Sequence, residues 1–116
     1  MSGQRFCQAL DLADDPALIA EYQRLHQRIW PEIADHLRRQ GVLDMQIWRL
    51  GTRLFMVMET APEFRADTMD KASAEHPRVQ QWEELMWAFQ KPTPWTELGN
   101  KWQPMQRIFS LAEQPQ

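Results

Sequence analysis

A chain of 116 residues with 13 basic and 16 acidic side chains has a formal charge of −3. This balance argues against a general nucleic-acid binder, which usually presents a strongly basic surface. The length predicts a single domain over residues 1–116. Cys7 is the only cysteine, so an intrachain disulfide framework is excluded, and a reducing, cytoplasmic location is expected. The sequence has no run of eighteen apolar residues and no leader-like apolar stretch behind Met1, so we expect neither membrane insertion nor secretion.

The first predicted elements are a strand and a long, interrupted helix. Residues 5–12 alternate loosely between two faces, which is typical of a strand. A helix is predicted over residues 16–40, with Asp15 as its cap and Gly41 at its end. Because a proline disfavours helical geometry in the residue before it, we expect this helix to kink or restart at Trp30-Pro31.

Two short apolar segments, 45–50 and 54–59, flank the turn sequence 51–53 and predict a β-hairpin. Both faces of the second segment are apolar, with Leu54, Met56 and Met58 on one face and Phe55 and Val57 on the other. Helices of the same chain cover only one face of an antiparallel sheet, and this chain is too short to supply a second sheet. We therefore expect a homodimer in which two sheets face each other.

The second half of the chain predicts two more helical segments and a closing strand. Residues 60–63 have the spacing of a capping box, which favours a helix over 61–73. Pro77 is suited to start a second helix, and the following residues form an apolar stripe at helical spacing: Val79, Trp82, Leu85, Met86 and Phe89. A proline-containing loop over 91–100 leads to a last strand over 102–111. The order βαββαβ predicts an α+β domain of the ferredoxin-like plan, which by itself decides no function.

Tyr22 and His26 are the candidate catalytic residues. They are four residues apart in the first predicted helix, so their side chains lie one above the other on its apolar face. Histidine exchanges a proton near neutral pH because its unperturbed pKa is about 6.5. Tyr22 would orient the imidazole or hold a substrate. The same spacing also fits a second interpretation, in which both rings are core or interface residues satisfied by nearby backbone groups.

No metal or cofactor site is predicted. His36 follows the expected kink and His76 lies in a loop, so neither is expected to join His26, and no two histidines have short metal-ligand spacing. The sequence contains no Gly-rich phosphate loop and no nucleophile elbow. A nucleophilic role for Cys7 would need a nearby base and an electropositive setting, so we interpret it as a buried strand thiol.

Three further side chains have two interpretations each. Trp82 lies on the apolar stripe, where a core position is the default, but indole rings also form platforms for the C–H faces of sugars. Glu83 borders the stripe and is either part of a solvated face or an acceptor for a sugar hydroxyl. Trp95 lies among prolines in a loop, where a large ring is expected to be a lid or a dimer contact.

The segment 21–26, Glu-Tyr-Gln-Arg-Leu-His, followed by Ile-Trp-Pro-Glu-Ile at 29–33, resembles the opening motif of the L-rhamnose mutarotase family. The resemblance extends over nearly the whole chain, through the strand at 54–59, the helix around Trp82 and the closing strand. The tail at 101–111 is similar to relatives associated with L-fucose. The resemblance implies a dimeric α/β barrel, without metal or cofactor, that interconverts the α and β anomers of a deoxy sugar.

The resemblance also implies roles for particular residues. His26 matches the proton donor of the family, and Tyr22 and Trp82 match residues that bind the sugar. Two positions depart from the family pattern: Met45 replaces a tyrosine, and Glu83 replaces a second tryptophan. Each replacement alters a pocket contact. The resemblance therefore supports the type of reaction better than it supports the identity of the sugar.

The sequence therefore predicts an aldose mutarotase, or sugar 1-epimerase, for L-fucose or L-rhamnose. In this prediction His26 gives a proton to the ring oxygen and takes one from the anomeric hydroxyl, so that the ring opens and recloses on its other face. One alternative is a cofactor-independent monooxygenase on the same barrel, with the aromatic residues binding a flat apolar substrate. A second alternative is a non-catalytic binding module, in which Trp82 and Trp95 hold a ligand and His26 is structural.

Overall fold

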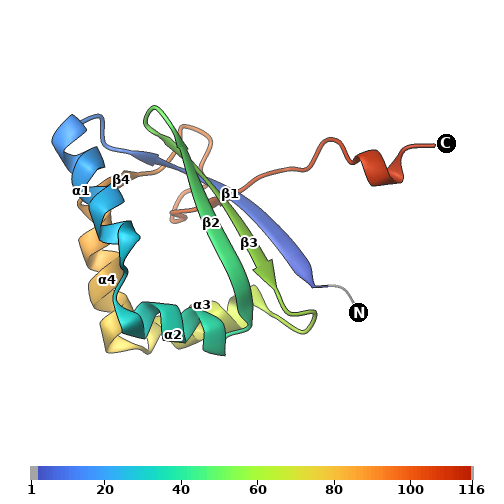
Figure 1. Cartoon of the computed structure of the whole chain (residues 1–116), viewed down its shortest axis with the longest axis horizontal. Helices are drawn as coiled ribbons and strands as arrows, with labels where there is room; N and C mark the ends of the chain where they lie inside the picture. The colour runs from blue at the N-terminus through green and yellow to red at the C-terminus, as the bar shows by residue number, and fades with distance from the viewer. Residues whose placement is uncertain (1–2, 116) are drawn as a thin grey trace.

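An antiparallel sheet forms the centre of the computed structural model, which describes residues 3–115 (Figure 1). The sheet has three long strands and two strands of two residues each: β1 (Gln4–Leu12), β2 (Val42–Leu50), β3 (Arg53–Thr60), β4 (Gln90–Lys91) and β5 (Gln103–Pro104). The strand order is β2-β3-β1-β4, and β5 also pairs with β1. The predicted α+β class and the β-α-β-β-α-β order are both confirmed, except that each helical segment is a pair of helices.

Four helices cover one face of this sheet (Figure 1): α1 (Pro16–Gln27), α2 (Pro31–Arg39), α3 (Ala66–Ala74) and α4 (Pro77–Trp87). Within residues 3–115, no helix is long and apolar enough to cross a bilayer.

The interruption of the first helical segment follows the sequence closely. Asp15 Oδ1 accepts hydrogen bonds from the backbone N–H groups of Ala17 and Leu18, at 2.9 and 3.3 Å, and so caps α1. The helix stops before Trp30, and Pro31 starts α2, because a proline ring disfavours helical geometry in the residue before it. Gly41 ends α2 with a φ of +96°, a conformation that residues with a Cβ rarely adopt.

Two predicted boundaries are wrong. The helix predicted over 61–73 begins only at Ala66, because Thr60 is still part of β3, where it pairs with Val42 and with Gln4. The Thr60 hydroxyl donates to the carbonyl of Ala61 at 3.1 Å instead of capping a helix.

The strand predicted over 102–111 is reduced to β5. Its ladder with β1 ends with the Met105 N–H, which donates to the Cys7 carbonyl at 2.8 Å. Residues 106–115 then lead away from the body of the molecule and contain a single 3₁₀ turn, η1 (Leu111–Glu113) (Figure 1). This segment exposes three large apolar side chains, those of Ile108, Phe109 and Leu111.

The two faces of the sheet have different surroundings. On the inner face, which the helices cover, Leu54, Met56 and Met58 are buried in the core. The outer face presents Cys7 and Ala9 of β1, Trp48 of β2, and Phe55 and Val57 of β3, which the strand register places opposite one another. The thiol of Cys7 is exposed on this face, so the prediction of a buried thiol is wrong for the single chain. The outer face is thus apolar and not covered by helices. This is the arrangement that led us to expect a homodimer, in which the sheet of a second chain covers this face.

Candidate active site

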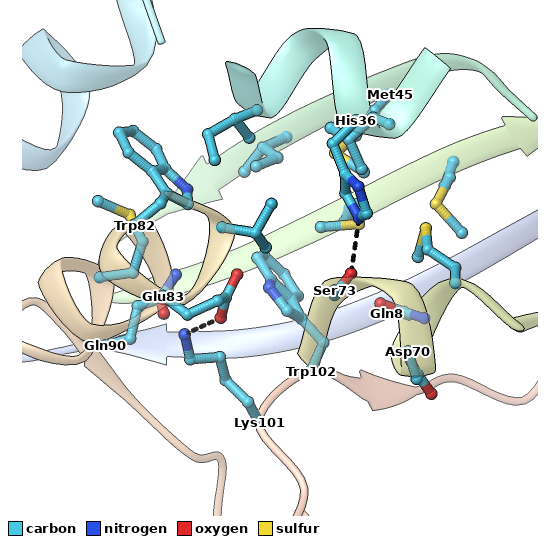
Figure 2. Close-up of a pocket in the computed structure, with 18 of the residues that line it drawn as sticks. Gln8, His36, Met45, Asp70, Ser73, Trp82, Glu83, Gln90, Lys101 and Trp102 are labelled. Atoms are coloured by element: carbon cyan, nitrogen blue, oxygen red, sulfur yellow. Dashed lines mark hydrogen bonds and ion pairs between the residues drawn. The ribbon is translucent and has the colours of Figure 1, made fainter. Parts of the chain in front are cut away.

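A cavity of about 630 Å³ lies between the helices and the inner face of the sheet. This volume is within the range of roughly 300 to 1,000 Å³ that is typical of small-molecule sites. Its walls combine methionine and aromatic side chains with a few polar groups, some of which are labelled in Figure 2. Such a lining suits a small ligand with both apolar and hydroxyl-bearing faces.

Tyr22 and His26 both line this cavity. Their ring centroids are 4.2 Å apart, with the rings tilted by 33°. The His26 Nδ1 atom lies 2.8 Å from the backbone carbonyl oxygen of Tyr22. Because a carbonyl oxygen only accepts, Nδ1 carries the proton, and in the neutral ring Nε2 is left with its lone pair. The hydrogen bond therefore fixes a tautomer whose second nitrogen is a base.

Burial determines the charge of this imidazole. Desolvation lowers the pKa of His26 below its ordinary value of 6.5, and the hydrogen bond to the Tyr22 carbonyl offsets this only in part. No charged residue is among the causes of the shift. His26 is therefore neutral at pH 7 and can accept a proton from a bound ligand.

The phenol of Tyr22 is held by Gln90. The Gln90 Nε2 atom donates to the Tyr22 hydroxyl oxygen at 3.1 Å, and both side chains are buried. Burial raises the pKa of Tyr22 to about 12; the hydrogen bond from Gln90 offsets part of this rise, and the Glu83 charge adds a smaller increase. The hydroxyl therefore stays protonated at neutral pH and keeps its own proton for donation to a ligand. Sequence reasoning missed Gln90, because it lies where the predicted helix meets the predicted loop, and a lone glutamine gives no pattern.

Trp82 combines its two predicted interpretations. It is only 6 % exposed, so it is a core residue, and it also lines the cavity. Its ring packs edge-on against His26 and Trp30, with centroid distances of 5.5 and 5.1 Å. These contacts fix the indole beside the imidazole, where an apolar face of a ligand can pack against it.

The two positions that depart from the family pattern both lie in the wall of the cavity. Met45 lines it from β2, and Glu83 lines it from α4. Glu83 pairs with Lys101, whose Nζ lies 2.7 Å from Oε2 (Figure 2). Lys101 and Trp102 also line the cavity, and sequence reasoning missed both as site residues. Only their place in the fold, where the chain returns to β1, brings them to the site.

His36 joins the same cavity as His26, although the sequence analysis placed it outside the site. Its Nε2 lies 2.8 Å from the Ser73 hydroxyl oxygen, and its ring centroid is 5.4 Å from that of His76. Burial, and then the neighbouring His76, lowers the pKa of His36. Across residues 3–115, no group of three or more His, Cys, Asp or Glu side chains is placed to hold a metal ion.

Trp95 lies outside the lining of the cavity. Its side chain is exposed, and the Arg53 guanidinium lies 5.0 Å from its ring centroid. The structure therefore does not bring Trp95 together with Trp82 at one ligand site.

Known proteins resemble the chain in both sequence and fold. The sequence profile of L-rhamnose mutarotase matches residues 5–111. An L-fucose mutarotase of Xanthomonas campestris pv. campestris is 44% identical over 115 residues, which cover 97% of this chain and 92% of that protein. An L-rhamnose mutarotase of Brucella anthropi is 33% identical over 84 residues, which cover 71% of this chain and 74% of that protein.

A crystal structure of an L-rhamnose mutarotase from Formosa agariphila superposes with a TM-score of 0.68, covering 93% of this chain and 98% of that chain. Its sequence identity of 17% makes this a likeness of fold alone. The profile and the relatives, with this shared fold, show that the chain belongs to the L-rhamnose mutarotase family.

Proposed function

We propose that this chain is a mutarotase that interconverts the α and β anomers of a 6-deoxy sugar, and that L-fucose is its preferred substrate. Membership of the family supports the reaction. The relative named L-fucose mutarotase, which is similar over almost the whole chain, supports the sugar.

The observation that carries the proposal is the hydrogen bond from His26 Nδ1 to the Tyr22 carbonyl. It leaves Nε2 as a neutral base on a side chain that lines the cavity. In the reaction, Nε2 takes the proton of the anomeric hydroxyl while the bond between C1 and the ring oxygen breaks. The imidazolium then gives that proton to the ring oxygen, producing the open aldehyde. Both oxygens are bonded to C1, so one nitrogen can serve each in turn.

Ring closure on the other face completes the exchange. Rotation about the C1–C2 bond turns the aldehyde, the former ring oxygen attacks C1, and the proton returns through His26 to the new anomeric hydroxyl. Tyr22 donates its hydroxyl proton to a sugar oxygen, and Trp82 packs against an apolar face of the ring. General acid–base help is typically worth about 10² to 10⁴ in rate.

The test is anomer exchange measured by proton NMR. Addition of the wild-type protein to L-fucose is expected to raise the rate of exchange between the α and β anomeric protons, and His26→Ala is expected to lose about 10² to 10⁴ of that acceleration. Gln23→Ala, at an exposed position of the same helix, serves as the matched control and should keep the wild-type rate. Equal acceleration by the wild-type and His26→Ala proteins would remove the imidazole from the mechanism.

We further propose that the chain forms a homodimer, a dimeric α/β barrel, through the outer face of its sheet. Trp48 on this face is 61% exposed, and Phe55 and Val57 extend the apolar surface across β3. Large continuous apolar surfaces of this kind usually mark interfaces.

A cytoplasmic location is also proposed, since a lone, exposed Cys7 suits a reducing compartment.

A further inference from the structure

The wall of the cavity contains an ion pair that the proposed proton transfer does not use. Lys101 Nζ lies 2.7 Å from Glu83 Oε2. The Lys101 side chain is 13% exposed and that of Glu83 is 46% exposed, so the pair is neither fully solvated nor sealed in the core. Figure 2 shows the pair beside Gln90, with Trp82 and Trp102 on either side of it.

Lys101 is held in place by two contacts. Besides the bond to Glu83, its Nζ lies 4.7 Å from the ring centroid of Trp87, within the range of a cation–π interaction. A lysine fixed in this way has already lost side-chain freedom before a ligand arrives, which favours binding. Its ammonium has three N–H groups, and only one of them is needed for Glu83.

The pair presents a donor and an acceptor side by side. The bond to Lys101 uses Oε2, so Oε1 of Glu83 is the oxygen that can accept from a ligand hydroxyl. Neighbouring hydroxyls of a sugar ring can each donate and accept, which matches such a pair. Glu83 follows Trp82 directly in α4, and its charge contributes to the raised pKa of Tyr22. The polar pair therefore adjoins both the candidate stacking ring and the candidate catalytic residues.

We propose that Glu83 and Lys101 are specificity-determining residues that bind ring hydroxyls of the sugar and favour L-fucose over L-rhamnose. This inference rests on the proposed mutarotase function. The two sugars have the same methyl group and differ only in the orientation of the hydroxyls on C2 and C4. Apolar packing on Trp82 discriminates weakly between such isomers. A charged pair discriminates more strongly, because a hydroxyl that points the wrong way forfeits a charge-assisted hydrogen bond.

The experiment measures kcat/KM for both sugars by NMR anomer exchange with the full-length protein. Glu83→Gln and Lys101→Met are each expected to lower kcat/KM for L-fucose by about tenfold to a hundredfold, the usual range for one charge-assisted hydrogen bond. The loss for L-rhamnose is expected to be much smaller, so the ratio of the two values falls. The pH dependence of the rate should stay that of the wild-type protein, because His26 is untouched.

A charge-swapped double variant separates recognition from a structural tie. Glu83→Lys with Lys101→Glu keeps an ion pair between α4 and the segment before β5, but it exchanges the donor and the acceptor. We expect it to keep the wild-type melting temperature and to lose the preference for L-fucose. Asp11→Asn is the control, since it weakens the Asp11–Arg53 pair between β1 and β3, which is similarly half-buried, has a 2.8 Å contact, and does not line the cavity.

The outcomes distinguish this inference from the proposed function. Suppose that the wild-type protein accelerates exchange and that the single variants lower kcat/KM equally for both sugars, or for neither. The role of the pair in specificity is then overturned, while the mutarotase function stands. A charge-swapped variant with the wild-type sugar ratio would overturn it too. If the wild-type protein accelerates exchange of neither sugar, the proposed function fails and this inference fails with it.

Discussion

At the scale of single residues, the state of His26 depends on what surrounds its ring. Two aromatic neighbours, Tyr22 and Trp82, and the inner wall of the cavity remove it from water, while its one polar partner is a neutral carbonyl. A carboxylate in that position would instead raise its pKa and favour the imidazolium. The site thus favours a histidine that starts neutral, takes a proton and then returns it. Ring opening needs these two proton transfers in this order.

This state predicts the pH dependence of the reaction. Since burial lowers the pKa of His26, the basic form persists below pH 6.5, and the protein-dependent exchange rate should stay level from pH 8 down to about 6.5. The rate should fall only as the pH passes the lowered pKa. The measurement is the NMR exchange rate of L-fucose between pH 5 and 8, after subtraction of the spontaneous rate at each pH. A decline that already begins above pH 7 would mean that the pKa is raised, contrary to the described environment.

At the scale of elements, the junction between α2 and β2 depends on Gly41. Its φ of +96° is open to glycine and costly for most other residues, although an added Cβ would meet nothing closer than 3.8 Å. Gly41→Ala should therefore lower the free energy of unfolding by about 1 to 2 kcal/mol through backbone strain alone. Urea denaturation measures this loss. Gly41→Asn should lose less, because asparagine tolerates the left-handed region better, and equal losses for both variants would contradict the explanation.

The contact between α2 and α3 predicts a second effect on stability. His36 is buried and bonded to Ser73, and its pKa is lowered, so the folded protein binds a proton less readily than the unfolded chain does. The contribution of neutral His36 to the free energy of unfolding is then fully present above pH 6.5. This contribution is lost as the pH falls through the lowered pKa. His26 contributes with the same sign, so the comparison must be made between variants. Urea denaturation from pH 7.5 to 5 should show a shallower decrease for His36→Asn than for the wild-type protein, and parallel curves would rule out His36 as a source.

Much of this element structure could be predicted from local sequence. The cap at Asp15, the break at Trp30-Pro31 and the end at Gly41 each rest on one or two residues whose backbone preference is strong. The prediction was wrong at Thr60, whose preference for capping a helix competes with strand pairing. In the structure Thr60 stays in β3, where it pairs with both neighbouring strands.

The site was predictable only in part, for a related reason. Tyr22 and His26 meet within one helix, so spacing alone brings them together. His36 reaches the cavity from α2, Gln90 from β4 and Lys101 from the segment before β5. Their approach is set by tertiary packing, for which a single sequence holds no periodic signal.

At the scale of the whole molecule, the two faces of the sheet make different demands. The inner face is covered by the helices of the same chain, with the cavity between them and the sheet. The outer face is apolar at Trp48, Phe55 and Val57, and residues 106–115 lead away from the body with further apolar side chains exposed (Figure 1). Both features cost free energy in water unless they are covered, at roughly 25 cal/mol for each Å² of apolar surface.

The proposed dimer predicts how mutations on this face act. Trp48→Asp places a charge on the apolar outer face, opposite Phe55, and should convert the wild-type dimer to monomers or weaken its association at least tenfold, because a buried, unpaired carboxylate is strongly unfavourable. Light scattering coupled to size-exclusion chromatography gives the mass of each species over a range of concentrations. Ala20→Asp adds the same charge at an exposed position of α1 and should leave the mass unchanged. A wild-type protein that elutes as a 13.8 kDa monomer at high concentration would contradict the dimer, and the apolar outer face would then need another partner.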